Sequence, residues 1–168
     1  SMQERVYNIV NRGHNFADVV ESFQIAKDAG YKIVAHMMPG LPTMTPEQDI
    51  EDFKMLFEDQ RFKPDMLKIY PSLVLENTPL YKDYKDGTYK PYSDEDMIRV
   101  LTEIKKDVPS WVRIMRVQRE ISSSEIIAGP KIGNLRQMVL KRLGEQNISC
   151  KCIRCREAGL SKKYDLSS

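Results

Sequence analysis

The sequence of 168 residues contains no apolar run that approaches the roughly 20 residues of a membrane-spanning helix. It also lacks internal repeats and low-complexity segments, which excludes a repeat array. We therefore expect a chain without a membrane partner. Apolar residues make up 41% and charged residues 30%, which is typical of a globular domain with one buried core.

Cysteine is scarce in this sequence. The three that occur, Cys150, Cys152 and Cys155, fall within six residues. An odd, tightly spaced set is a poor disulfide framework and favours a reducing compartment, here the cytoplasm. Thiolates at this spacing can close on one soft metal ion, and zinc is the metal that we expect. A structural zinc site takes four ligands. The fourth is expected from one of five sources: His14, His36, Glu157, a residue outside this sequence or a partner chain.

Two other interpretations are open. The cysteines could hold an iron–sulfur cluster with one open iron, or they could be three free thiols. Clusters that cleave S-adenosylmethionine use gaps of three and then two residues, whereas the first gap here is a single residue. The spacing therefore favours zinc.

The net charge of +2 hides a strong asymmetry along the chain. Residues 111–168 hold 12 Lys and Arg against 5 Asp and Glu, whereas residues 1–110 hold 14 against 19. A basic end on an acidic body predicts a surface that binds a polyanion, and a solvated tail is the alternative. The residues expected to follow an RNA phosphate backbone are Arg136, Arg154, Arg156, Lys162 and Lys163.

Helices alternate with short strands in the apolar pattern. Capping residues predict helix starts at Asn15, Thr45 and Ser93, and a fourth helix is expected to begin at Gly133-Asn134. Strands are expected over residues 32–38, 66–70, 111–117 and 148–153, with a long loop over residues 71–92. Strands separated by helices pair in parallel, and a complete eight-fold barrel needs about 250 residues. We therefore predict an α/β fold, a partial (half) TIM-like barrel of parallel βα units with a Cys-rich C-terminal connector.

Two segments end predicted strands, where α/β barrels place ligand contacts. The segment from His36 to Pro42 combines a histidine with a Gly-Pro loop that lets the backbone approach a ligand, or it is an ordinary turn with a packed histidine. Lys68, in the next strand, either points into a barrel mouth to bind a carboxylate or phosphate, or snorkels at a sheet edge.

A third segment runs from Arg113 to Glu120. Strand alternation predicts Arg116 and Gln118 on one face, with Arg113 and Arg119 on the other. One face would line a ligand site while the other meets solvent or RNA, and ordinary surface arginines are the alternative.

Five segments taken in order resemble the catalytic subunit of Elongator, a family that joins a radical S-adenosylmethionine domain to an acetyltransferase domain. The resemblance runs from about residue 8 to residue 159. It is carried by residues 11–14 (NRGH), 35–42 (AHMMPGLP), 64–71 (PDMLKIYP), 116–121 (RVQREI) and 133–136 (GNLR).

This resemblance implies modification of the wobble uridine of tRNA at carbon 5, which starts a carboxymethyl group. Acetyl-CoA would donate two carbons, and reductive cleavage of S-adenosylmethionine at a four-iron four-sulfur cluster would supply a 5′-deoxyadenosyl radical. The cofactor-binding candidates it implies are His36, Met38 and Gly40. The residues that would line the barrel mouth are Lys68, Tyr70, Arg116 and Gln118.

By the same resemblance, residues 1–146 correspond to the C-terminal half of the radical barrel. Residues 147–168 correspond to a zinc-type connector toward an acetyltransferase domain. The cluster-binding cysteines, the early barrel strands and the acetyl-CoA domain are not in this sequence, so we expect the fragment alone to be inactive. The partners expected are tRNA and other Elongator subunits, and an unpaired barrel edge predicts self-association. The alternative function is a free-standing zinc-containing RNA-binding or assembly module.

Overall fold

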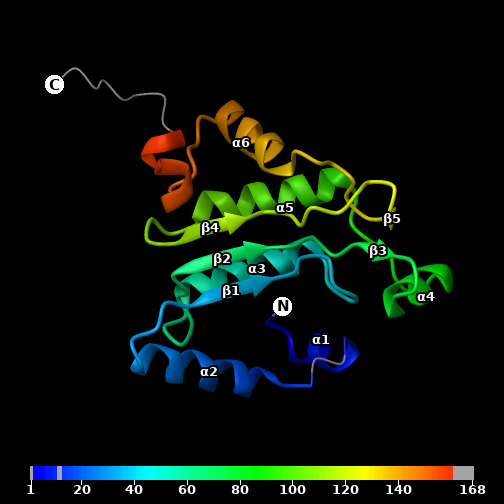
Figure 1. Ribbon diagram of the computed structural model, residues 1–168, viewed down its shortest axis with the longest axis horizontal. Helices are drawn as coiled ribbons and strands as arrows, with labels where there is room; N and C mark the ends of the chain where they lie inside the picture. Colours follow the sequence, from blue (N-terminus) through cyan, green and yellow to red (C-terminus); the bar gives the residue numbers. More distant parts are fainter. Residues whose placement is uncertain (1, 11–12, 161–168) are drawn as a thin grey trace.

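The computed structural model describes residues 2–10 and 13–160 (Figure 1). Asn11 and Arg12, in the first segment of the resemblance, lie outside these residues. Lys162 and Lys163, which the charge pattern assigns to an RNA surface, lie outside them as well.

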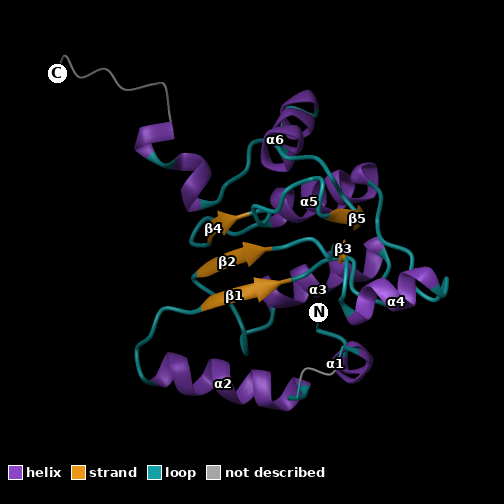
Figure 2. Ribbon diagram, turned by 45° about the vertical axis from the view of Figure 1, so that its right-hand side comes forward, coloured by secondary structure: helices purple, strands orange, loops and turns teal. Residues whose placement is uncertain are grey.

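Three parallel strands form the main sheet, in the order β1-β2-β4 (Figure 2). They are β1 (Val34–Met37), β2 (Met66–Ile69) and β4 (Arg113–Arg116). Every residue of β1 pairs with β2 without interruption, from Val34 opposite Met66 to Met37 opposite Ile69. The parallel pairing predicted from the strand–helix alternation is thus confirmed.

Helices cover one face of this sheet. Figure 1 shows α3 (Pro46–Glu58) and α5 (Asp94–Asp107) packed behind the strands, with α6 (Leu135–Glu145) beside α5. Two further helices, α1 (Glu4–Ile9) and α2 (Phe16–Asp28), lie on the side of β1. The sequence pattern had not indicated α1.

Capping explains where the long helices begin. Asn15, Thr45 and Ser93 each accept a hydrogen bond from the backbone N–H three residues on, and each receives a side chain back in return. Such reciprocal capping boxes satisfy two helix donors that would otherwise lack partners. The helix expected from Gly133-Asn134 is α6, and Asn134 precedes it without a side-chain capping bond.

A single hydrophobic cluster links the sheet to α3, α5 and α6, and it extends into the cysteine segment. Phe53, Leu67, Leu101 and Ile114 are among its fully buried members. Cys152 belongs to the same cluster, so the cysteine segment packs on the same core as the sheet and its helices. Within the described residues, no helix has the length and apolar character needed to cross a bilayer.

The segment expected as a long loop, residues 71–92, contains regular structure. It holds β3 (Val74–Leu75) and α4 (Pro79–Lys85), and β3 pairs antiparallel with β5 (Ile126–Ala128). The helix begins in the ordinary way, because Thr78 caps it and Pro79 occupies its first turn. The prediction missed this helix signal, and a pairing with residues some 50 positions away leaves no local pattern.

The predicted strand over residues 148–153 is wrong. Ile153 donates a single backbone hydrogen bond to Val112, 3.0 Å long, and the chain then turns into the 3₁₀ helices η1 (Ile153–Arg156) and η2 (Ala158–Leu160). The cause is the convergence of three cysteines, since an extended strand would carry their sulfur atoms apart.

Candidate functional site

One row of side chains crosses the sheet on the face that the helices leave uncovered. His36 in β1 pairs with Lys68 in β2, and Lys68 pairs in turn with Arg116 in β4. The alternating burial of β1 and β2 puts His36 and Lys68 opposite the buried side, away from α3 and α5. The structure therefore brings together three residues that the sequence had singled out separately.

A β-bulge produces this row. The register between β2 and β4 shifts after Leu67, so that Arg116 stands opposite Lys68 and Met115 is left without a direct partner. Arg113 pairs with Met66, which shares the face of Lys68. The expectation from simple alternation, that Arg113 and Arg116 lie on opposite faces, is therefore wrong, because the extra residue resets the phase.

Tyr70 contacts His36 at one end of the row, and Gln118 follows Arg116 along the chain at the other. The ring of Tyr70 meets the His36 ring edge-on, with the ring centroids 4.5 Å apart. Gln118 directs its amide nitrogen to the carbonyl of Ile132 at 3.0 Å, which ties the segment after β4 to the approach to α6. Tyr70 thus accompanies the row, whereas Gln118 has a structural partner.

Buried polar groups hold the loop after β1. Gly40 donates its N–H to the Asp49 carboxylate at 2.8 Å, and its carbonyl accepts from the Tyr89 hydroxyl at 2.7 Å. The backbone has a φ of 81° at Gly40, and an added Cβ would stand 3.3 Å from the Tyr92 ring. Glycine is therefore needed here for its left-handed backbone and for the close approach of Tyr92. Met38 packs beside the small cluster that contains Leu41.

Burial of Asp49 raises its pKa from 3.8 to about 6, although the Gly40 N–H and the Tyr92 hydroxyl both stabilise its charged form. Tyr92 donates to the same carboxylate oxygen at 2.8 Å. Burial and the facing carboxylate also raise the pKa of the Tyr92 hydroxyl, which therefore acts as a donor. The loop is thus fixed by a carboxylate that costs free energy to keep ionised.

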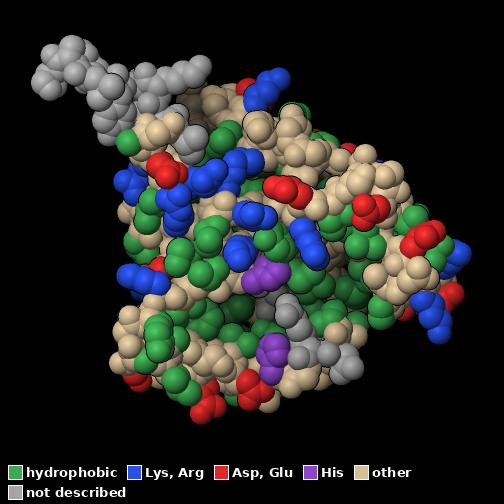
Figure 3. Space-filling model, in the orientation of Figure 1, with side chains coloured by type: hydrophobic (Ala, Val, Ile, Leu, Met, Phe, Trp, Pro, Cys, Tyr) green, Lys and Arg blue, Asp and Glu red, His purple; other side chains and the backbone are tan. Residues whose placement is uncertain are grey.

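A groove of about 850 Å³ opens beside β4 and the segment that follows it. Its lining includes four arginines, Arg116, Arg119, Arg136 and Arg154, and one acidic residue, Glu120. Among the described residues, Arg116 and Arg119 form no ion pair, and both are exposed. Figure 3 shows Lys and Arg side chains gathered over β4 and the cysteine segment on this face. The groove can therefore accept an anion without first breaking an internal contact of Arg116 or Arg119.

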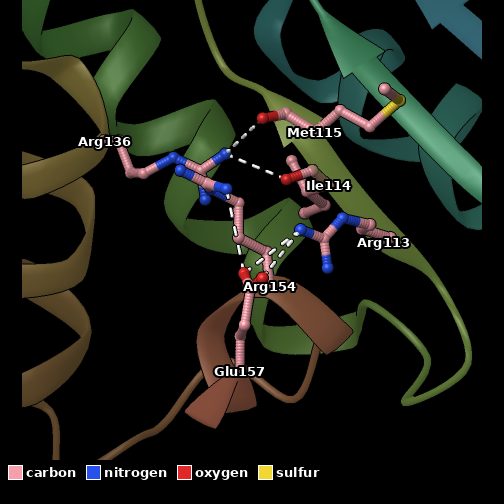
Figure 4. A network of polar contacts seen from close by, with 6 residues as sticks. All are labelled: Arg113, Ile114, Met115, Arg136, Arg154 and Glu157. Carbon is pink, nitrogen blue, oxygen red and sulfur yellow. Dashed lines mark hydrogen bonds and ion pairs between the residues drawn. The ribbon is translucent and has the colours of Figure 1, made fainter. Parts of the chain in front are cut away.

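Arg136 serves the protein itself. Its guanidinium donates to the carbonyls of Ile114 at 3.0 Å and Met115 at 3.5 Å, so it caps groups that the bulged strand leaves exposed (Figure 4). Burial lowers the pKa of Arg136 from the usual arginine value. Arg154 reaches the carboxylate of Glu157, which also binds Arg113. These two arginines have internal partners, unlike Arg116 and Arg119.

The three cysteines form a compact cluster. Their sulfur atoms all lie within 4.8 Å of one another, and Cys150 and Cys152 are buried. A tight turn brings them together, because the N–H of Cys155 donates to the carbonyl of Cys152 at 3.0 Å. Hydrogen bonds from Cys150 and Cys155 lower the pKa of Cys152 below the ordinary thiol value. Three soft donors at this separation fit a tetrahedral metal ion.

Among the described residues, no histidine, further cysteine or carboxylate joins the three cysteines as a fourth ligand. Glu157 is held by Arg113 and Arg154, His14 packs against Tyr7, and His36 lies on β1. The three sources inside the described chain are therefore excluded. Of the five sources expected from the sequence, a residue outside this sequence and a partner chain remain, and residues 161–168 lie outside the described part of the chain.

Arg156 also has structural partners, because its guanidinium donates to the carbonyls of Lys151 at 2.8 Å and Ser110 at 2.6 Å.

Sequence reasoning missed two residues that the structure singles out, Asp49 and Lys105. A capping box points to Thr45 and not to the buried carboxylate four residues later. Lys105 looks like an ordinary cation in the last turn of a helix.

Known proteins are similar to this chain in sequence and in structure. Residues 64–145 match the family described as the Radical_SAM C-terminal domain. The chain is 45% identical to human Elongator complex protein 3 over 162 residues. This matched stretch covers 96% of this chain and 30% of that protein. It is 44% identical over 160 residues to the tRNA uridine(34) acetyltransferase of Methanocaldococcus jannaschii, covering 93% and 30%.

A solved structure agrees with the sequence relatives. The archaeal Elp3 of Methanocaldococcus infernus with an N-terminal deletion superposes with a TM-score of 0.92 at 41% identity, covering 95% of this chain and 38% of that one. The α/β fold and its partial barrel are thus confirmed. The chain spans about 30% of the length of the curated relatives named above. The chain is therefore similar to one segment of Elongator complex protein 3 and of tRNA uridine(34) acetyltransferase, and its residues 64–145 match the Radical_SAM C-terminal domain.

Proposed function

We propose that this chain is part of an enzyme that modifies the wobble uridine of tRNA, and that the arginine groove beside β4 binds the tRNA phosphate backbone. One observation carries the proposal: Arg116 and Arg119 are exposed without an acidic partner among the described residues, in a chain that resembles tRNA uridine(34) acetyltransferases. Cations left without internal partners on a basic face favour a polyanionic ligand.

The finer chemistry follows the family. We propose carboxymethylation at carbon 5, with acetyl-CoA and S-adenosylmethionine as cosubstrates in the cytoplasm. Radical formation and acetyl transfer would depend on parts of the longer protein that are not in this sequence, so the fragment alone is expected to be inactive. Other Elongator subunits are proposed partners, since Elongator complex protein 3 is a relative.

Within this chain, the row formed by His36, Lys68 and Arg116 is proposed to face the reacting groups. It lies on the uncovered face of the parallel sheet, where a barrel would have its interior. Tyr70 and Gln118 complete the proposed mouth. The loop that contains Met38 and Gly40 is proposed to lie near S-adenosylmethionine, because buried contacts hold it at the carboxyl end of β1.

Cys150, Cys152 and Cys155 are proposed to hold zinc. The fit rests on three sulfur atoms within 4.8 Å of one another in a largely buried turn. Bound zinc would supply folding energy and no chemical step, because sites with three cysteine ligands, such as Cys₃His and Cys₄, are structural. Residues 147–168 would then be the connector. Its cations Arg154, Arg156, Lys162 and Lys163, with Arg136, are proposed to extend the RNA surface beyond Arg116 and Arg119.

The test is tRNA binding as a function of salt. The double variant Arg116→Gln/Arg119→Gln should bind tRNA more weakly, and the slope of log affinity against log salt should flatten by roughly 1.4–1.8, because two phosphates would no longer be neutralised. The matched control is Arg61→Gln/Arg99→Gln, which removes two exposed arginines that already pair with Asp59 and Glu47. An unchanged slope in the first variant, or an equal change in the control, would reject the groove.

A further inference from the structure

Lys105 is a fully buried cation. It lies in the last turn of α5, and its side chain is 1% exposed. The ammonium nitrogen stands 3.4 Å from the sulfur of Cys150 and 3.7 Å from that of Cys155. Among the described residues, no carboxylate forms an ion pair with it, so the cysteine cluster supplies its polar partners.

This placement needs a reason, because an unpaired ammonium is costly to bury. A neutral thiol is a weak acceptor and compensates little of that cost. The neighbouring Lys106 shows the usual arrangement, since it stays partly exposed and binds Glu103 at 2.6 Å. Negative charge on the sulfur atoms beside it would compensate the burial of the Lys105 ammonium.

Metal binding supplies that charge. Cysteine binds zinc as the thiolate, so three cysteines and a neutral fourth ligand leave the zinc centre with one net negative charge. That charge would itself be unfavourable in a buried site. We propose that Lys105 is the positioning and charge-balancing residue of the metal centre, whose ammonium neutralises the zinc–thiolate group. This inference rests on the zinc proposed above.

The inference predicts that replacing Lys105 affects the zinc-free and the zinc-bound protein differently. Without zinc, methionine at position 105 keeps the length of the side chain and removes a poorly compensated charge, so the zinc-free protein should be no less stable. With zinc, the same change leaves the metal centre with an unbalanced charge, so zinc should bind more weakly. A side chain that only filled space would instead lower the stability of both states alike.

The experiment uses the whole 168-residue chain with zinc alone as the probe. Zinc affinity is measured by competition with a chromophoric chelator for wild type, Lys105→Met and the control Lys106→Met. The unfolding midpoint is measured with and without zinc. We expect Lys105→Met to weaken zinc binding about 10- to 100-fold, the range for partners of metal ligands. Lys106→Met should stay close to wild type, because Lys106 binds Glu103 and not the cysteines.

Each outcome decides something. Wild-type zinc affinity in Lys105→Met overturns the inference while leaving the zinc site intact. A zinc-free variant that loses as much stability as the zinc-loaded one also overturns it, because the role is then packing. A wild-type chain that binds no zinc overturns the proposed metal and this inference together, and leaves the arginine groove untouched.

Discussion

The two sides of the three-stranded sheet are held by charges of opposite sign. On the side of β1, the buried carboxylates Asp49 and Asp52 accept hydrogen bonds, including those from the backbone N–H groups of Gly40 and Met2. On the side of β4, Arg136 donates to strand carbonyls, while Lys105 faces the cysteine sulfurs. The buried charged groups that stabilise the fold therefore show the same asymmetry as the sequence, with acidic groups near β1 and basic groups near β4.

The two sides differ in whether their charged residues have partners inside the chain. Asp49 has its donors inside the chain, so its charge serves the structure. On the side of β4, Arg136 is used internally, whereas Arg116 and Arg119 have no ionic partner among the described residues. The proposed anionic ligand would therefore bind on the side of β4. Three variants test how far the comparison holds.

The largest effect is expected at Asp49. Its pKa is about 6 in the folded protein against 3.8 for the ordinary group, so the folded state holds the proton more tightly. The resulting stabilisation is complete below about pH 3.8 and is lost as the pH rises through about 6. The unfolding free energy of Asp49→Asn relative to wild type should therefore rise by up to about 3 kcal/mol between pH 4 and pH 7.

Denaturant unfolding at several pH values measures this difference. Glu47→Gln on the same helix is the control, because a backbone hydrogen bond and Arg99 lower the pKa of exposed Glu47 and so give a slope of opposite sign. Parallel stability curves for Asp49→Asn and wild type would show that the carboxylate on the side of β1 carries no buried charge cost.

A smaller effect is expected at Arg136. Arg136→Met leaves the carbonyls of Ile114 and Met115 without their donor, which should cost about 1–3 kcal/mol of unfolding free energy. Arg142→Met is the matched control on the same helix, and it should cost less than about 1 kcal/mol because Glu95, the partner of Arg142, is exposed. Urea unfolding at equal zinc loading measures both, and equal losses would contradict the capping role.

The smallest effect is expected at the outer edge of β1. Val34 is 41% exposed there, beside a cavity of about 200 Å³ between β1 and the first two helices. If this edge drives self-association, Val34→Lys should weaken it about tenfold, since charged side chains protect strand edges. Met138→Lys makes a similar change at a 36% exposed site on α6 and should have little effect. Sedimentation velocity over a concentration series decides, and a monomeric wild type would refute the premise.

Local signals carried much of the fold. The capping boxes at Asn15, Thr45 and Ser93 predicted three helices, because a cap is made by residues only three positions apart. The three parallel strands followed from their alternation with helices. The cysteine spacing likewise predicted a compact metal-type cluster, because three ligands within six residues meet through one turn.

Non-local contacts decided the rest. The bulge that puts Arg116 beside Lys68 depends on the pairing of β2 with β4, and no feature of residues 113–116 alone requires it. The partnership of Lys105 with Cys150 spans 45 residues, and that of Gly40 with Tyr89 spans 49. Neither partner has a local signature of these contacts, which form only when the helices pack on the sheet.

The sequence by itself therefore determined the types of element, the order of the main strands and helices, and the asymmetry of charge. These depend on interactions between neighbours and on total composition. Only the tertiary structure decided which arginines serve the fold, which remain available to a ligand, and which cation lies beside the cysteines. The physical reason is that a charge acquires its role from burial and from partners, and folding brings those partners from distant parts of the chain.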